Sequence, residues 1–358
     1  MNPTLSQPNA QTNSSPTGIV ALKSDYPIAK AGKSVKSVNL GKPIRLVDTK
    51  DLSHQEWLDV RKQGIGSSDA PTVCGVNPYM SLLELWLIKT GRTEPSQTPV
   101  DGYAPLYWGK QLEPLVAKYY TAKTGNKVRR VNAVLQHPEH EFMLANLDYA
   151  VSNPDVGVLE IKTAGIHGAK LWQNGVPLYV ACQVQHQLAV TGKQLAHVCV
   201  LLGGHEARLF EVKRDDVLIE QIIKQERQFW QYVKDDIAPP ADGSESAQKA
   251  LQALCPSGVG EIDFSDNLLL NDYFDELLEQ KRLIDEHQAR FDYLKQQLCQ
   301  AMNEHDIATF AHGSISWKKS KDSVSLDSKA LLKDKPELLE QYPQIRQGSR
   351  RFVINHAK

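Results

Sequence analysis

The stretch from residue 142 to residue 163 constrains the fold more than any other part of the chain. It is apolar on both sides of a short turn at 153–157, so we interpret it as two antiparallel strands, Phe142–Val151 and Val156–Thr163. A third strand is expected just before them, at Lys127–Leu135. A chain built around these three strands forms a sheet rather than a helical bundle.

The second strand of this pair carries charged residues in a regular pattern. Glu160 and Lys162 are two residues apart and therefore project from one face, while Leu159 and Ile161 pack on the other. Asp148 comes from the preceding strand and can reach the face of Glu160 and Lys162. Two carboxylates and an ammonium group are thus expected to meet on one side of the sheet.

This arrangement favours a divalent cation. Carboxylates that converge on one point repel each other unless a cation lies between them, and oxygen ligands suit Mg²⁺ or Mn²⁺. The backbone carbonyl of Ile161 can add a further ligand, and Lys162 can orient a water or stabilise charge on a phosphate. An Asp…Glu-x-Lys triplet also occurs as a surface ion pair, but the apolar neighbours of this one favour a site.

Helices are expected on both sides of the strands. The segment "LYWGKQLEPLVAKYYTAKTG" is an amphipathic helix that ends at Gly125, and "PLYVACQVQHQLAVTG" is a second helix that ends at Gly192. Two further strands follow in "LAHVCVLLGG" and "EARLFEVKR". The order helix, three strands, helix, strand predicts an α/β fold with a mixed central sheet flanked by helices.

Composition excludes several classes of protein. The 358 residues include no apolar run long enough to span a membrane, and the five cysteines are scattered without a CxxC pair, which argues against a zinc site and for a reducing cytoplasm. The net charge is −1, but its distribution is uneven: residues 110–130 are basic, 263–306 are acidic and the end of the chain is basic again. Such segments can still present a positive groove to DNA.

We expect five regions along the chain, and they are a tail at 1–45, the core at 46–238, a linker at 239–262, a long helical segment at 263–306 and a small basic unit at 307–358. The helical segment has an apolar residue every seventh position from Leu270 to Leu298. It is one long helix or a helical hairpin, and its apolar stripe packs within the chain or forms an oligomer interface.

Four blocks of the sequence, in order, resemble the YqaJ-type viral recombinase branch of the PD-(D/E)xK nucleases, which is similar to lambda exonuclease. They are "WLDVRKQGIGSSDAPTVCGVNPYMSLLELWLIKTG", "WGKQLEPLVAKYY", "LANLDYAV…GVLEIKT" and "YVACQVQHQLAVTG". The resemblance covers about residues 53–213 and implies a restriction-endonuclease-like core. The "PD" of the motif is Leu147-Asp148 here, and the last 150 residues lie outside the resemblance.

The resemblance implies roles for the charged residues. Asp148 and Glu160 match metal ligands, Lys162 matches the catalytic lysine, and Glu113 matches a helix glutamate that joins the metal shell. The implied cofactor is Mg²⁺, for which Mn²⁺ can substitute.

A second pair, Arg61 and Ser68, matches the residues that hold a terminal 5′ phosphate, and an Arg fork beside a hydroxyl at a glycine-rich helix start suits that role. The neighbouring Ser67 and Asp69 leave the assignment of the hydroxyl open.

Three glutamines on the following helix compete for places in the site. The family pattern favours Gln183 and Gln185, whereas helical geometry puts Gln183 and Gln187 on one face. Gln183 satisfies both and is expected beside the catalytic residues, with Gln185 and Gln187 as candidates for DNA contact.

Taken together, the resemblance implies a Mg²⁺-dependent deoxyribonuclease that digests linear duplex DNA from 5′ to 3′ in the bacterial cytoplasm, from a phage, prophage or mobile element. It would leave 3′ single strands for a strand-annealing protein and could work as a ring trimer. The alternatives are an endonuclease with the same core and a non-catalytic DNA-binding or assembly module.

Overall fold

The computed structural model describes two compact units, which adjoin in the sequence at Pro256 and Ser257. The described residues are 42–93, 105–153, 155–344, 348 and 350–355. Residues 1–41 of the expected tail lie outside them. The last residues of that tail, Ile44 and Arg45, already belong to strand β1 (Ile44–Asp48).

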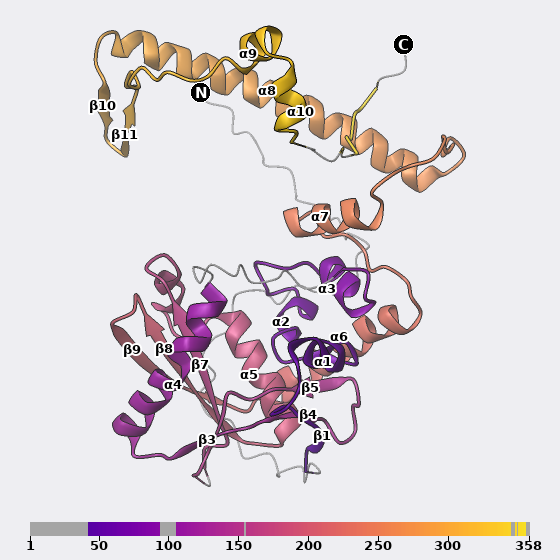
Figure 1. The fold of residues 1–358 in the computed structure, drawn as a ribbon, viewed down its shortest axis with the longest axis vertical. Coiled ribbons are helices and arrows are strands. Elements are labelled where there is room, and N and C mark those ends of the chain that lie inside the picture. Colours follow the sequence, from indigo (N-terminus) through magenta and orange to yellow (C-terminus); the bar gives the residue numbers. More distant parts are fainter. Residues whose placement is uncertain (1–41, 94–104, 154, 345–347, 349, 356–358) are drawn as a thin grey trace, which may run out of the picture. The chain divides into compact units, whose positions relative to one another are not determined.

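A five-stranded mixed sheet forms the centre of the first unit (Figure 1). Its order is β3 (Val128–Arg130), β6 (Tyr149–Val151), β7 (Val158–Ala164), β8 (Leu195–Leu202) and β9 (Glu206–Lys213). Only the β7–β8 pair of this sheet is parallel. Parallel neighbours need a crossover, which runs through the 3-10 helix η1 (Gly168–Trp172) and α5 (Leu178–Thr191). The predicted mixed α/β core is confirmed.

A second sheet of four strands, in the order β1, β4 (Ala133–Gln136), β5 (Met143–Ala145) and β2 (Ile65–Gly66), differs from the expectation. The strands expected at Lys127–Leu135 and Phe142–Val151 are each divided. The halves next to the connection between them, β4 and β5, join this sheet, and the other halves, β3 and β6, join the large one.

The division falls where the pairing of these two strands slips by one residue. Arg130 pairs with Tyr149, and Leu135 pairs with Ala145, so four residues on one strand face three on the other. An unequal count of this kind is a bulge, which bends a strand and re-aims its side chains. Asp148 lies on the shorter side of this bulge, opposite the extra residue in 131–134.

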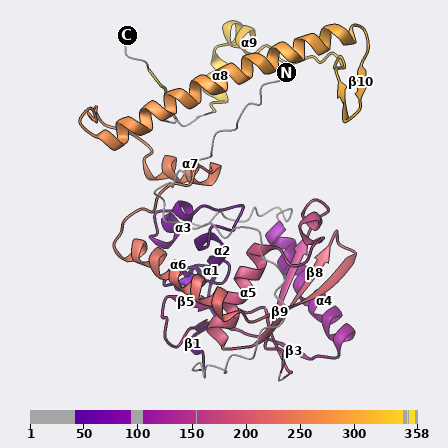
Figure 2. The ribbon, with the colours of Figure 1, turned by 180° about the vertical axis from the view of Figure 1, so that it is seen from behind.

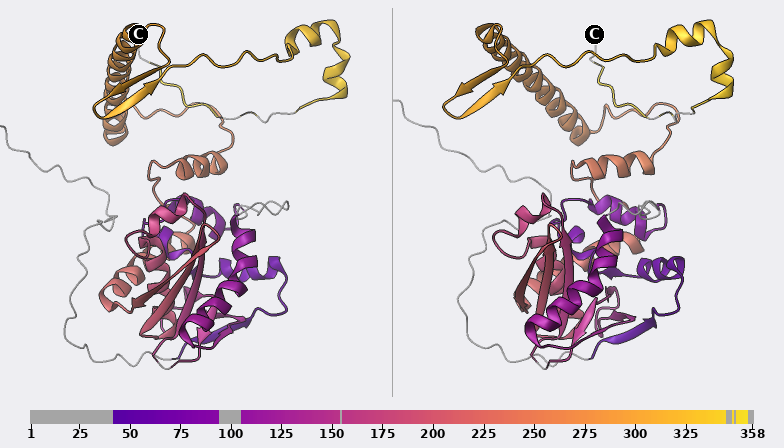
Figure 3. Two further views of the ribbon diagram at one scale, coloured as in Figure 1. Left: turned by 90° about the vertical axis from the view of Figure 1, so that its left-hand side faces the viewer. Right: turned by 60° about the vertical axis from the view of Figure 1, so that its left-hand side comes forward.

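Helices cover the two faces of the large sheet. α4 (Pro105–Thr124) packs Val116 and Tyr120 against Leu159 and Ile161 of β7 (Figure 3). On the other face, α5 lies over β7 and β8, and its apolar residues join the cluster that contains Val158 and Val198. The alternation of β7 therefore gives one face to each helix, as its sequence predicts.

Local signals fix the helix ends. α1 (His54–Lys62) begins with a capping box, in which Ser53 and Glu56 bond each other's backbone N–H. α4 and α5 end before Gly125 and Gly192, whose φ angles of 74° and 68° lie in the left-handed region.

The remaining helices of this unit are α2 (Ala70–Val73), α3 (Leu82–Lys89), α6 (Asp216–Lys234) and α7 (Glu245–Leu254) (Figure 2). α7 corrects the expected linker at 239–262. Ser244 caps this helix, the Oγ of Ser246 accepts the backbone N–H of Ser81 at 2.7 Å, and Ala250 is buried in the cluster around Trp86. Small residues spaced along one face therefore dock a helix within a segment whose Pro, Gly and Ser content indicates a loop.

The second unit contains α8 (Leu268–Met302), a hairpin of β10 (Ile307–Phe310) and β11 (Gly313–Ser316), α9 (Ser328–Asp334) and α10 (Glu337–Gln341). α8 is a single helix of 35 residues rather than a helical hairpin. Ile284 and Phe291 of its apolar stripe are 60% and 61% exposed, so the described part of this unit does not cover the stripe. Among the described residues, no helix has the length and apolar character of a membrane span.

Candidate active site

The bulge brings Asp148 to the edge of β7. Its Oδ2 accepts the backbone N–H of Ile161 at 2.9 Å. The β6–β7 ladder pairs Tyr149 with Leu159, so the Asp148 side chain continues the pairing where the strand has left the sheet. This bond fixes the carboxylate between the two neighbours of Ile161, Glu160 and Lys162.

Glu160 is buried and its carboxylate is held by three donors. Oε1 accepts Lys162 Nζ at 2.7 Å and Gln183 Nε2 at 2.6 Å, and Oε2 accepts Gln187 Nε2 at 2.7 Å. Lys162 Nζ also donates to Gln183 Oε1 at 2.9 Å. Gln183 and Gln187 are one helical turn apart on α5, so the helical interpretation of their spacing is the one that the structure shows.

Gln185 and Gln187 differ from their predicted place at the DNA. Gln185 faces away from the site, where its amide donates to the carbonyl of Lys213 and accepts the N–H of Asp215. Gln187 is fully buried and contacts Glu160 instead. Alternate residues of a helix point to different sides, and both of these side chains are buried in the protein.

Glu113 faces the same cavity from α4. Its carboxylate accepts Arg130 Nη2 at 3.2 Å, and the Arg130 guanidinium lies 5.7 Å from the Tyr149 ring centroid. Burial raises the pKa of Glu113, and the negative charge of Glu160 adds to the shift. The charge of Glu160 on β7 therefore affects the pKa of Glu113, although Glu113 belongs to helix α4.

The acidic residues repel each other. Burial and then the charge of Glu160 raise the pKa of Asp148 well above its ordinary value, although Lys162 opposes the shift. Burial acts to lower the pKa of Lys162, but Glu160 and Asp148 outweigh it and hold the pKa above its ordinary value. Raised pKa values in a group of carboxylates mean that too little positive charge lies near them, and a bound cation would supply that charge.

The donor set fits a hard divalent cation in kind. Asp148, Glu160 and Glu113 offer oxygen atoms, the ligands that Mg²⁺ and Mn²⁺ prefer. Within the described residues, no three His, Cys, Asp or Glu side chains yet stand close enough to hold an ion. At Glu160, the ammonium of Lys162 and the two glutamine amides bond the carboxylate oxygens.

A cavity of about 540 Å³ joins these residues to the predicted phosphate-binding residues. It is lined by Trp57, Arg61, Gly66, Ser67, Ser68, Gly109, Lys110, Glu113, Asn146, Asp148, Glu160, Ile161, Lys162, Thr163 and Gln183. The two groups meet because β2 and β5 are parallel neighbours, with Ile65 opposite Met143. The residues after β2 and those after β5 therefore emerge at the same edge of the small sheet.

Arg61 is held on several sides. Its guanidinium lies 4.8 Å from the Trp57 ring centroid, and Nη2 donates to Ser68 Oγ at 2.8 Å. A Cβ at Gly66 would lie 3.5 Å from Nη2, which is ordinary van der Waals contact, but only 3.2 Å from Asp69 Oδ2, which is tight. The Ser68 hydroxyl accepts from Arg61, which leaves its own hydrogen to donate to an anion. The Ser67 hydroxyl is buried and, among the described residues, has no hydrogen-bond partner.

Two contacts of Arg61 were not foreseen. Asp69 Oδ1 accepts Arg61 Nη2 at 3.1 Å, and Lys89 Nζ donates to the carbonyl of Arg61 at 2.8 Å. The sequence placed Asp69 only beside the phosphate-binding pair, as a neighbour that leaves the assignment open, and its side chain makes no capping bond with α2. A lysine within the apolar run of α3 was the one available signal for Lys89.

The mixed sheet, its crossover helix and the Asp148, Glu160 and Lys162 hairpin define a PD-(D/E)xK nuclease core. The profile of the YqaJ-like viral recombinase domain matches residues 56–194. The uncharacterized protein YqaJ of Bacillus subtilis (strain 168) is 33% identical over 299 residues, which cover 82% of this chain and 92% of that protein. The chain belongs to the YqaJ-like viral recombinase family.

Two solved structures overlap with part of the fold. The alkaline exonuclease LHK-Exo from Laribacter hongkongensis is 23% identical, with a TM-score of 0.43, over 56% of this chain and 100% of that chain. A phage-related exonuclease from Haemophilus somnus 129PT is 12% identical, with a TM-score of 0.37, over 50% of this chain and 99% of that chain.

Proposed function

We propose that the protein is a metal-dependent exonuclease that digests linear duplex DNA from 5′ to 3′ and leaves 3′ single strands for recombination by annealing. One observation carries this proposal: the acidic cluster and the Arg61–Ser68 pair line a single cavity. A strand end can therefore present a terminal phosphate to one part of the cavity and a phosphodiester to the other.

Asp148, Glu160, Glu113 and the carbonyl of Ile161 would hold Mg²⁺, or Mn²⁺ in its place. The bound cation would polarise the phosphoryl group and neutralise its charge. Lys162 places an ammonium beside Glu160 and so offers positive charge to the oxyanion of the transition state. Gln183 bonds both residues and keeps that ammonium in place.

Arg61 and Ser68 supply the preference for an end. The Arg61 bonds that we describe use Nη2 only, so Nε and Nη1 stay available to a phosphate oxygen, and the Ser68 hydroxyl can donate beside them. The buried hydroxyl of Ser67 is a third donor in the same wall. A 5′-terminal phosphate carries more negative charge than an internal phosphodiester, so this group of donors favours ends over continuous strands.

Strand-specific digestion tests the proposal. Linear duplexes labelled on one strand, with and without a 5′ phosphate, are incubated with Mg²⁺ or with EDTA, next to a closed circular plasmid. We expect shortening of the strand with the 5′ phosphate, slower digestion without it, an intact circle and no reaction in EDTA. Cleavage of the circle would instead indicate the endonuclease.

The non-catalytic alternative makes a different prediction. A vestigial module would bind DNA in the same assay but would shorten no strand under any of these conditions. Calorimetric titration of Mg²⁺ into the protein and into Asp148→Asn separates the two, because only a working site shows metal binding that depends on this carboxylate.

Family membership supports three further proposals. We propose a single-strand annealing protein as partner, a homo-oligomer such as a ring trimer around duplex DNA, and a bacterial host cytoplasm as the place of action. Sedimentation with and without duplex DNA measures the oligomeric state. A monomer in both conditions would contradict the ring.

A further inference from the structure

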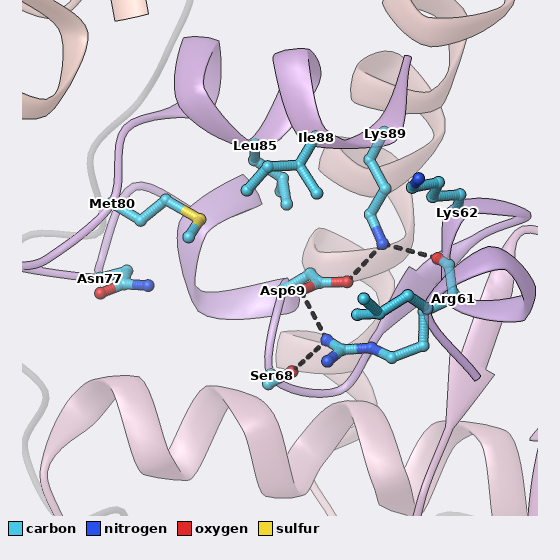
Figure 4. Close-up of a pocket in the computed structure, with 10 residues that line it drawn as sticks. Arg61, Lys62, Ser68, Asp69, Asn77, Met80, Leu85, Ile88 and Lys89 are labelled. Atoms are coloured by element: carbon cyan, nitrogen blue, oxygen red, sulfur yellow. Dashed lines mark hydrogen bonds and ion pairs between the residues drawn. The ribbon is translucent and has the colours of Figure 1, made fainter. Parts of the chain in front are cut away.

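Lys89 is a buried cation with two partners in the phosphate-binding region. It comes from the last turn of α3, and its side chain is only 3% exposed. Nζ donates to Asp69 Oδ2 at 2.6 Å and to the backbone carbonyl of Arg61 at 2.8 Å (Figure 4). A buried ammonium needs such partners, because its desolvation is costly.

Asp69 connects Lys89 to the rest of this region. Its Oδ1 accepts Arg61 Nη2 at 3.1 Å, and its Oδ2 accepts the backbone N–H of Gly66 at 2.9 Å as well as Lys89. One carboxylate thus ties together the Arg61 side chain, the turn that carries Ser67 and Ser68, and helix α3. Figure 4 shows the contacts of Lys89 and Arg61 with Asp69.

Arg61 is therefore fixed at both ends. Lys89 holds its backbone carbonyl, Asp69 and Ser68 hold Nη2, and Trp57 covers one face of the guanidinium. Its side chain keeps 24% of its surface exposed. An arginine held in this way meets an incoming phosphate in one orientation and loses little conformational freedom on binding.

We propose that Lys89 and Asp69 are positioning residues that set the preference for a 5′-phosphorylated end. Neither needs to touch the DNA. Lys89 keeps Asp69 ionised and in place, and Asp69 aims Arg61 and the Ser67–Ser68 turn at the phosphate. This inference rests on the proposed function, since it assigns a cause to the end preference of the same cavity.

Stability alone does not require this pair. Buried ion pairs are often replaced by apolar residues without loss of stability, and α3 is already apolar at Leu85 and Leu87. An apolar replacement would leave Arg61 without its carboxylate anchor. The pair at Arg92 and Asp236 offers a matched control, because it also joins a cation near the end of α3 to an aspartate, at 2.7 Å, but neither residue lines the cavity that contains Arg61 and Asp148.

The test compares kcat/KM on duplexes with and without a 5′ phosphate for the wild type, Lys89→Met and Arg92→Met. Misplacement of a binding group by about 1 Å can cost roughly 100-fold, so we expect the ratio of the two substrates to fall about 10-fold to 100-fold in Lys89→Met. The loss should fall mainly on KM for the phosphorylated end. Arg92→Met should keep the wild-type ratio.

A double variant guards against misfolding. Lys89→Met with Asp69→Asn removes both charges, so no unpaired charge stays buried, and it should fold while still losing the end preference. Unchanged ratios in both the single and the double variant would overturn the inference. If the wild type itself ignores the 5′ phosphate, the proposed function fails first, and the two failures are distinguishable.

Discussion

Two clusters of buried or half-buried charge contribute residues to the lining of the cavity, and they differ in balance. In the Asp69 cluster (Arg61, Asp69, Lys89), one carboxylate meets two cations, and their charges hold the pKa of Asp69 at about 2 although burial alone would raise it. In the Asp148 cluster (Glu113, Asp148, Glu160, Lys162), three carboxylates share Lys162 and the Arg130 guanidinium that contacts Glu113, and the pKa of Asp148 is raised.

This difference distinguishes a finished structural unit from an incomplete one. The Asp69 cluster satisfies its own charges and needs no ligand to hold its shape. The Asp148 cluster is left with excess negative charge, and it is at such sites that perturbed pKa values indicate function. The same type of side chain, aspartate, therefore stabilises the fold at one position and opposes it at the other.

The largest effect is expected from the two lysines. Lys162→Ala should lower kcat by about 10²- to 10³-fold, as the loss of a transition-state charge partner does, and should leave duplex affinity nearly intact. Lys89→Met should mainly change KM. Single-turnover digestion together with a DNA-binding titration measures both. Normal digestion by Lys162→Ala would show that the active-site assignment is wrong.

The next largest effect concerns the balanced cluster. Asp69→Asn leaves Lys89 buried without its counter-charge, and breaking a buried pair costs about 3–5 kcal/mol. We expect a clear fall in the free energy of unfolding in urea. The exposed Asp236→Asn is the control and should change it little. Equal free energies of unfolding for Asp69→Asn and Asp236→Asn would contradict a stabilising role of Asp69.

Metal binding should distinguish the two clusters, because only the Asp148 cluster is expected to hold the ion. At a Mg²⁺ concentration about 100 times the Kd, binding to the native state adds about 2.7 kcal/mol of stability. Thermal unfolding with Mg²⁺ and with EDTA should therefore show a rise for the wild type and for Asp69→Asn. Asp148→Asn should respond weakly. A full response from Asp148→Asn would mean that the ion binds elsewhere.

Without metal, the unbalanced cluster should gain from neutralisation. Asp148→Asn removes a repelled charge while its amide oxygen can still accept the N–H of Ile161. We expect stabilisation by about 1 kcal/mol, at the cost of activity, as is common for active-site residues. Urea unfolding in EDTA measures it. A destabilised variant would contradict the excess of negative charge inferred at Asp148.

The smallest expected effect is a difference in pH dependence. The pKa of Asp69 is depressed to about 2 from an ordinary value of 3.8, so its stabilisation is present above pH 4 and is lost as the pH falls toward 2. The raised pKa of Asp148 gives the opposite sign: its penalty is fully present above that raised pKa and shrinks to zero as the pH falls from there to the ordinary value of 3.8.

Unfolding midpoints of both Asp→Asn variants, each compared with the wild type in EDTA from pH 7 to pH 3, test this opposition. The advantage of Asp148→Asn should shrink across this range. The disadvantage of Asp69→Asn should persist to about pH 4 and fall only below it. If the unfolding midpoints of Asp69→Asn and Asp148→Asn changed with pH in parallel, the charges of Asp69 and Asp148 would have equivalent effects on stability.

Sequence periodicity predicted much of this arrangement, because the relevant signals are local. The faces of β7 and the helix ends at Gly125 and Gly192 each depend on neighbouring residues. The resemblance to the family brought in Glu113 and Arg61, which no local pattern would select.

What the sequence did not reveal depends on contacts between distant segments. Lys89 is 20 residues from Asp69, and only the fold shows that they meet. The place of Gln187 required the position of α5 over Glu160, and the division of the strands depends on a slip of one residue that composition does not mark. Helix α7 was missed because a docking surface on α3, rather than its own composition, explains its packing.

The pairing of β2 with β5 has a consequence for how far each catalytic cycle would advance. Hydrogen-bonded strands lie about 4.8 Å apart, and this ladder separates the turn at Ser67–Ser68 from the loop that carries Asp148. Under the proposed function, the protein backbone sets a fixed distance between the 5′ end of the DNA strand and the phosphodiester to be cut. The length of the released fragment would then be uniform whatever the base sequence.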